Sequence, residues 1–193
     1  MERTGIIIVA GGSGRRAGGA RPKQFAFLAG MPVLARTINN FAEAMPGAEI
    51  VAVLPEQHIE FWNNLAARFD VAPHTVAAGG AERFDSVRNG LAALTSDPEL
   101  IAVQDGVRPL GSVGMIRRVA EAAARHGAAV PVVEPVDSFR ETEEEPDTEG
   151  IVPSRIVDRR RLRIVQTPQF FRADVLRRAY GADYRAEFTD DAS

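Results

Sequence analysis

The chain has 193 residues, of which 45% are hydrophobic and 25% charged, and this globular composition excludes a disordered, collagen-like or low-complexity protein. It contains no cysteine, which excludes disulfide scaffolds, thiolate zinc sites and cysteine nucleophiles. The net charge of −3 argues against a partner made of nucleic acid.

The first two-thirds of the chain alternates short aliphatic runs with amphipathic stretches. The aliphatic runs are apolar on both faces, as buried parallel strands are, and predict strands at 5–10, 49–54, 71–76, 100–104 and 128–133. Pro73 places the third of these strands near an edge of the sheet. The amphipathic stretches predict helices at about 32–44, 56–69, 82–94 and 113–126. This alternation predicts a doubly wound α/β fold with a mostly parallel sheet and right-handed crossovers.

The alternation of strands and helices stops after Val133. An acidic segment at 140–150 is followed by a basic segment at 155–163, and the stretch 146–150 between them is typical of a turn. We expect a single domain over 1–193 with an excursion at about 136–162, in which a hairpin pairs strands of opposite charge. The segment 165–171 then returns to the core, and 172–180 is a last helix.

No run of the sequence predicts a membrane association or export. The longest aliphatic stretch, 6–10, is far shorter than the roughly 20 residues of a membrane span. The first four residues carry no apolar signal core behind a basic start. We therefore expect a cytoplasmic protein that binds neither a membrane nor nucleic acid.

A glycine-rich, cationic loop follows the first predicted strand. It reads Ala10-Gly-Gly-Ser-Gly-Arg-Arg16 and continues to Arg21-Pro-Lys-Gln24, and Lys23 is the only lysine of the chain. Glycines let the backbone approach a polyphosphate and aim N–H groups at its oxygens, and the cations balance its charge. The loop therefore predicts a polyphosphate site, in which Gly12 and Gly14 are candidates for phosphate contact.

Two known phosphate-binding motifs are missing from the loop or poorly matched by it, and this narrows the identity of the polyphosphate. No Gly-Lys-Ser/Thr completes a Walker A motif. A dinucleotide fingerprint can be forced onto Gly12, Gly14 and Ala17, but the strand ending at Leu54 has no carboxylate at its tip to hold a ribose. A triphosphate is favoured, and an NAD-dependent oxidoreductase stays an outside alternative.

Two further segments lie at predicted strand ends or helix starts. Asp105, at the end of the 100–104 strand, is placed to hold Mg²⁺ on phosphate oxygens, and Arg108 suits a second phosphorylated group by bidentate contact. The alternative for Asp105 is a loop carboxylate that caps the next helix. The glycine pair Gly79-Gly80 opens the helix that carries Arg83 and Ser86, and its backbone suits recognition of a base edge; an ordinary turn is the alternative.

Eight motifs in order resemble those of the 2-C-methyl-D-erythritol 4-phosphate cytidylyltransferases of the non-mevalonate isoprenoid pathway. The motifs span nearly the whole chain, at 10–16, 22–24, 79–86, 105–109, 135–138, 157–159, 166–171 and 189–193. The resemblance implies a Rossmann-like nucleotidyltransferase fold with a protruding β-arm. It also implies a reaction in which CTP and the sugar-alcohol phosphate give the CDP-alcohol and pyrophosphate.

The resemblance also implies a role for each matching residue. Arg16 and Lys23 would stabilise the transition state at the α-phosphate, and Asp105 would position Mg²⁺. The nucleotide would contact Ala10, Gly11, Gly12, Gly14, Gly80, Ala81, Arg83 and Ser86 as well as Asp105. The methylerythritol phosphate would contact Arg108, Ser138, Arg159, Thr167 and Thr189. The arm is exchanged between two subunits in this family, so a homodimer is implied, with Ser138 and Arg159 completing the neighbouring site.

The sequence departs from the family pattern in three places. Ser138 stands where Thr is usual, which keeps the hydroxyl, and Ala81 stands where an acidic residue is frequent. The family's C-terminal strand, Asn-x-Lys loop and closing helix have no counterpart up to Ser193. If the natural protein is truncated in this way, weak or no turnover is expected.

Three other functions remain as alternatives. The sister enzyme that uses ribitol 5-phosphate shares most of these motifs, although the short loop before Pro22 favours the methylerythritol enzyme. A nucleotide-sugar pyrophosphorylase for another base is disfavoured by the segment 83–86. A non-catalytic nucleotide sensor is disfavoured because Arg16, Lys23 and Asp105 are all present.

Overall fold

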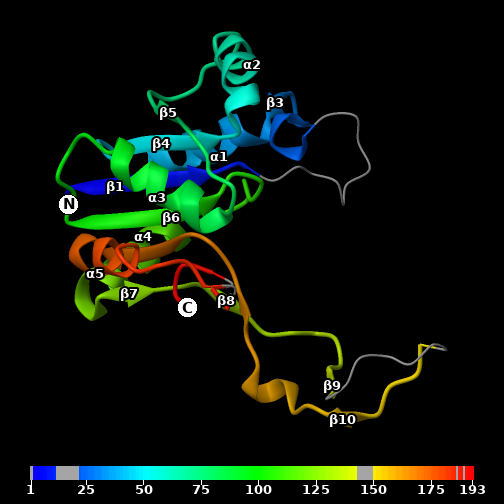
Figure 1. Ribbon diagram of the computed structural model, residues 1–193. Coiled ribbons are helices and arrows are strands. Elements are labelled where there is room, and N and C mark those ends of the chain that lie inside the picture. Colours follow the sequence, from blue (N-terminus) through cyan, green and yellow to red (C-terminus); the bar gives the residue numbers. More distant parts are fainter. Residues whose placement is uncertain (1, 12–21, 143–149, 186, 189) are drawn as a thin grey trace. The chain divides into compact units, whose positions relative to one another are not determined.

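The computed structural model describes residues 2–11, 22–142, 150–185, 187–188 and 190–193 (Figure 1). The chain divides into two compact units: residues 1–130 with 167–193, and residues 131–166. Within the described ranges, no helix is long and apolar enough to cross a membrane.

The first unit is built on a six-stranded sheet of order β5-β4-β1-β6-β12-β7. Its strands are β1 (Thr4–Val9), β4 (Glu49–Leu54), β5 (Thr75–Ala78), β6 (Leu100–Asp105), β7 (Ala128–Ala129) and β12 (Gln169–Arg172). The pairs β5–β4, β4–β1 and β1–β6 are parallel, whereas β12 runs antiparallel to both β6 and β7. A doubly wound α/β fold with a mostly parallel sheet is thus confirmed.

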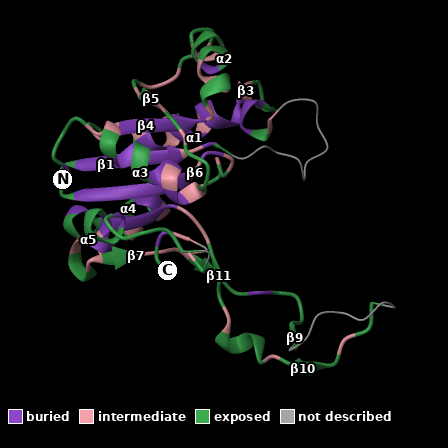
Figure 2. Cartoon of the chain, in the orientation of Figure 1, coloured by how far each residue is buried: buried purple, intermediate pink, exposed green. Residues whose placement is uncertain are grey.

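Helices cover both faces of this sheet (Figure 1). They are α1 (Val33–Ala44), α2 (Glu56–Ala66), α3 (Arg83–Ala93), α4 (Val113–His126) and α5 (Ala173–Ala179). Successive β1 side chains point to opposite faces, so Ile6 and Ile8 pack in the cluster that holds apolar residues of α1 and α4, and Ile7 packs with those of α3 and α5. The central strands are accordingly buried along almost their whole length (Figure 2).

Two predicted strands differ from the structure. The strand expected at 71–76 begins only at Thr75, because Asn39 accepts the Ala72 backbone N–H at 2.8 Å and the preceding segment follows α1 instead of the sheet. The strand expected at 128–133 is divided: Ala128–Ala129 forms β7, and Val132–Val133 forms β8 in the second unit. Pro131, which has no N–H to donate to a sheet, lies at the break.

The second unit contains two short antiparallel pairs. β8 pairs with β11 (Ile164–Val165), and β9 (Arg140–Thr142) pairs with β10 (Ser154–Ile156), while the 3-10 helix η3 (Arg159–Arg161) lies between β10 and β11. The Glu141 carboxylate accepts from Arg155 Nε at 2.9 Å across the β9–β10 pair. Opposite charges therefore do pair across this hairpin, although most of the acidic run, at 143–149, lies outside the described residues.

Candidate active site

The strands β1, β4 and β6 end along one edge of the sheet, which we call the carboxyl edge. The Ala10 N–H donates to the Val53 carbonyl, and the Gly106 N–H to the Val9 carbonyl, each at 2.8 Å. A Cβ on Gly106 would lie 2.8 Å from the Ala10 Cβ, so only glycine lets the two loops approach this closely. The start of the glycine-rich loop and Asp105 are thereby brought side by side.

Gln24, at the C-terminal end of the cationic loop, is bonded to the residue that follows β1. Its amide nitrogen donates to the Ala10 carbonyl at 2.8 Å, and the side chain is only 1% exposed. The neighbouring Lys23, at the start of η2 (Lys23–Phe25), is exposed at the end of the loop. Gly12, Gly14 and Arg16 lie outside the described residues, so their predicted roles stay predictions.

The glycine pair before α3 belongs to the same edge, because the Gly79 N–H donates to the Leu54 carbonyl at 2.8 Å. Buried Ser86 accepts from the Gly80 N–H and donates to the Glu82 carbonyl, both at 3.1 Å. A Cβ on Gly11 would lie 3.9 Å from Ser86 Oγ. Two predicted nucleotide-binding segments, 10–11 and 80–86, are therefore adjacent.

Two arginines contact the Asp105 carboxylate. Arg108 Nε donates at 2.9 Å, and an Arg83 nitrogen lies 3.4 Å away. The Asp105 N–H donates to the Thr167 hydroxyl at 3.3 Å. The structure thus brings together Asp105 and two residues predicted to hold the second substrate, Arg108 and Thr167.

Arg83 makes its closest contacts with a carboxylate that the sequence reasoning did not identify. Its two terminal nitrogens donate to the two oxygens of Asp191 at 2.6 and 2.7 Å, and the Asp191 side chain is 0% exposed. Burial opposes the charge on Arg83, but the hydrogen bond to Asp191 and the charges of Asp191 and Asp105 together outweigh it and raise the pKa of the guanidinium further above its usual range. Burial, and then the charge of Asp191, raise the pKa of Tyr180 well above that of a free phenol, so its hydroxyl stays protonated.

The four remaining predicted residues are Ser138, Arg159, Thr189 and Ala81. Ser138 and Arg159 are exposed in the second unit, where Arg159 donates to the Val136 carbonyl. Thr189 lies outside the described residues. Ala81, at the start of the α3 segment, is exposed beside Gly80.

A metal at this edge would depend on phosphate oxygens for most of its ligands. Within the described ranges, no three His, Asp or Glu side chains are grouped so that they could hold an ion. Mg²⁺ characteristically takes one or two carboxylates and completes its shell with waters and substrate phosphates. The single strand-end carboxylate of Asp105 beside a glycine-rich loop fits that donor set.

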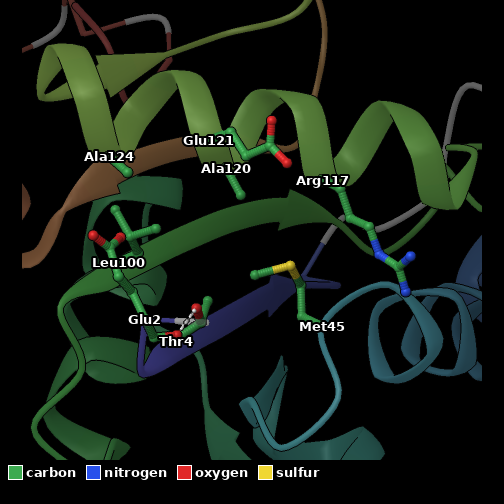
Figure 3. Close-up of a pocket in the computed structure, with 8 residues that line it drawn as sticks. All are labelled: Glu2, Thr4, Met45, Leu100, Arg117, Ala120, Glu121 and Ala124. Carbon is green, nitrogen blue, oxygen red and sulfur yellow. Dashed lines mark hydrogen bonds between the residues drawn. The ribbon is translucent and has the colours of Figure 1, made fainter.

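An apolar pocket of about 350 Å³ lies at the opposite edge of the sheet (Figure 3). Thr4 and Leu100, which line it, begin β1 and β6, and Met45, Arg117 and Ala120 line its other sides. Because Asp105 is at the other end of β6, this pocket is separate from the candidate site.

Comparisons with known proteins agree with the motifs. The family model for 2-C-methyl-D-erythritol 4-phosphate cytidylyltransferase matches residues 4–193. Relatives of that name from Bacteroides thetaiotaomicron and Porphyromonas gingivalis are 42% and 46% identical, each over 97% of this chain and over 83% and 80% of the relative. The crystal structure of the Thermus thermophilus enzyme of that name is 32% identical, with a TM-score of 0.68 over 100% of this chain and 82% of that one.

Proposed function

The chain belongs to the 2-C-methyl-D-erythritol 4-phosphate cytidylyltransferase family, and we propose that it transfers CMP from CTP to 2-C-methyl-D-erythritol 4-phosphate, releasing pyrophosphate. The observation that carries this proposal is the meeting of three segments at the carboxyl edge. Gly11 begins the cationic loop, Ser86 orders the Gly80 backbone, and Asp105 ends β6 between two arginines.

In this reaction, an oxygen of the sugar-alcohol phosphate attacks the α-phosphorus of CTP in line. The bond between the α-phosphorus and the oxygen bridging to the β-phosphate breaks, and that oxygen leaves with the pyrophosphate. Proteins catalyse such transfers mainly by positioning and by stabilising charge. We assign to Lys23 and Arg16 the stabilisation of the negative charge that grows on the α-phosphate and on the leaving pyrophosphate.

The two substrates are assigned to opposite sides of Asp105. Backbone groups at Ala10, Gly11, Gly80 and Ala81 would contact the nucleotide, and the proximity of Gly11 and Ser86 supports this assignment. Arg108 and Thr167 would hold the second phosphate, since both contact Asp105. Asp105 would hold Mg²⁺, which when bound neutralises phosphate charge.

The proposal includes a homodimer and a cytoplasmic reaction. Ser138 and Arg159 belong to the second unit, whose described strands expose the apolar side chains of Val132, Val133, Ile156, Ile164 and Val165. Exposed apolar side chains on a small unit are typical of surfaces that bind another chain. CTP is made and used inside cells, which supports the cytoplasmic reaction that we propose.

The test is pyrophosphate release from CTP, UTP, ATP and GTP, each with Mg²⁺ and methylerythritol phosphate. We expect release from CTP at a rate at least tenfold above the other three, because a site that hydrogen-bonds a base edge rejects bases that leave its groups unpaired. Binding of CTP without release in the natural full-length protein would favour the nucleotide sensor. Equal release from all four nucleotides would contradict base recognition.

A further inference from the structure

Asp191 is a buried carboxylate that has no part in the proposed reaction. Two side chains fix it: the Tyr180 hydroxyl donates to one oxygen at 2.6 Å, and Arg83 donates to both oxygens. Its backbone N–H donates to the buried Gln169 side chain at 3.1 Å. A carboxylate held at this many points has little freedom to move.

The partner of Asp191 is also close to the proposed metal ligand. Arg83 lies 2.6 and 2.7 Å from the Asp191 oxygens but 3.4 Å from the nearest Asp105 oxygen. Bidentate arginine–carboxylate pairs with short distances are among the strong hydrogen-bonded contacts in proteins. The Arg83 guanidinium therefore contacts both carboxylates, and its hydrogen bonds to Asp191 are the stronger ones.

Aromatic packing fixes the same network from the other side. The Tyr180 ring stacks on the ring of Phe84 at a centroid distance of 4.7 Å, and Phe84 directly follows Arg83 in α3. The first turn of α3 and the segment after α5 are thus joined by a ring contact and by an ion pair. Neither Arg83 nor Asp191 can shift without disturbing the other.

We propose that Asp191 is a positioning residue that draws the Arg83 guanidinium toward itself and so weakens the pairing of Arg83 with Asp105 Oδ1. Arg108 pairs with the other oxygen, Oδ2, so Oδ1 is the oxygen that this arrangement keeps available to Mg²⁺. The inference rests on the proposed function, because it concerns the metal of that reaction. Without the Asp191 charge, Asp105 is the carboxylate already next to the guanidinium, and a cation paired there competes with the metal.

The experiment measures CTP binding by titration calorimetry over a range of Mg²⁺ concentrations, which requires no turnover. Asp191→Asn keeps the shape of the side chain and removes its charge. We expect it to raise the Mg²⁺ concentration for half-maximal CTP binding about tenfold, the size of effect seen when groups that support a metal ligand are lost. Tyr180→Phe, which leaves the carboxylate in place but less fixed, should raise it by a smaller factor.

The deciding comparison is made in a background without the guanidinium. In Arg83→Gln, the further change Asp191→Asn should not alter the Mg²⁺ concentration for half-maximal CTP binding, which we call the Mg²⁺ midpoint, because Asp191 acts through Arg83. The matched control is Glu49→Gln at the start of β4, whose carboxylate accepts four hydrogen bonds from Thr95 and Ser96. It should lower the melting temperature without moving the midpoint.

Two results would overturn the inference. One is a Mg²⁺ midpoint in Asp191→Asn and Tyr180→Phe equal to that of the unmodified protein. The other is the same rise with and without Arg83, which would give Asp191 a merely structural role. An unmodified protein that binds no CTP at any Mg²⁺ concentration would instead overturn the proposed function, and this inference with it.

Discussion

Lys23 and Gln24 are neighbours in sequence with opposite surroundings. Gln24 is buried and bonded to the Ala10 carbonyl, whereas Lys23 is exposed at the end of the cationic loop. The Gln24 anchor fixes the backbone that carries the lysine, so the ammonium is held near the end of β1. A compact ammonium also differs from the planar guanidinium used everywhere else in this chain.

Lys23→Ala should lower kcat about 10²–10³-fold while changing CTP affinity far less, because the ammonium acts on charge that develops in the transition state. Steady-state kinetics together with equilibrium CTP binding separates the two effects. Lys23→Arg is the matched variant and should recover only part of the rate. Equal losses in kcat and in CTP affinity would make Lys23 a ground-state binder instead.

Single residues at strand ends were predictable from the sequence, but their long-range partners were not. Asp105 follows a recognisable buried strand, and ligands in such sheets bind at the strand ends. The contact between Arg83 and Asp191 joins residues 108 positions apart, and no local pattern encodes it. Asp191 lies within the motif at 189–193, but the family resemblance implied a role there only for Thr189.

At the scale of elements, strong periodicity gave accurate boundaries. β4 and α4 have the predicted ends, 49–54 and 113–126. The Ser112 hydroxyl caps the α4 N-terminus, and Gly127 ends the helix at a φ of 94°, which favours glycine. The segment 128–133 was mispredicted because its apolar run continues across the border between the two units, which hydrophobicity cannot reveal.

The start of α3 provides a test at this scale. Gly80→Ala would place its Cβ 2.2 Å from the Asp85 Cβ and 3.2 Å from the Asp85 backbone, so the turn has to move. We expect the melting temperature to fall. We also expect CTP affinity to fall about tenfold, which corresponds to a loss of roughly 1.4 kcal/mol of binding free energy.

Gly114→Ala is the control for this substitution. Gly114 is exposed in the first turn of α4, and the nearest atom to an added Cβ is an Arg118 side-chain nitrogen at 3.5 Å. This change should be neutral or stabilising by up to about 1 kcal/mol and should leave CTP binding unchanged. Unaltered CTP affinity in Gly80→Ala would remove this turn from the nucleotide site.

At the scale of the whole molecule, the order of strands explains why distant segments form one site. β1 lies between β4 and β6, and β5 lies beside β4, so the segments that follow β1, β5 and β6 meet although they begin at positions 10, 79 and 106. The strand–helix alternation predicted a doubly wound sheet with its ligand at the strand ends, but it did not predict the order of the strands. In the second unit, the charge pattern predicted the hairpin, whereas a role for it came only from the family resemblance. The unit has few buried apolar residues, so hydrophobic periodicity does not indicate what it packs against.

The proposed sharing of sites across a dimer is tested by mixing two variants that are each impaired in a different way. Arg159→Ala should raise the KM for the sugar-alcohol phosphate, and Lys23→Ala should lower kcat. If Arg159 completes the neighbouring site, a random mixture of the two variants contains about one intact site in four. Activity at low substrate should then rise above that of either variant alone. A mixture no more active than its components would place both residues in the same subunit's site.

The central claim is most directly tested by measuring pyrophosphate release from CTP and Mg²⁺ with methylerythritol phosphate and ribitol 5-phosphate side by side. The natural full-length protein should release pyrophosphate with methylerythritol phosphate, in a one-to-one ratio with the CDP-alcohol, and should be nearly silent with ribitol 5-phosphate. Release with ribitol 5-phosphate alone, or with neither substrate, would contradict the account.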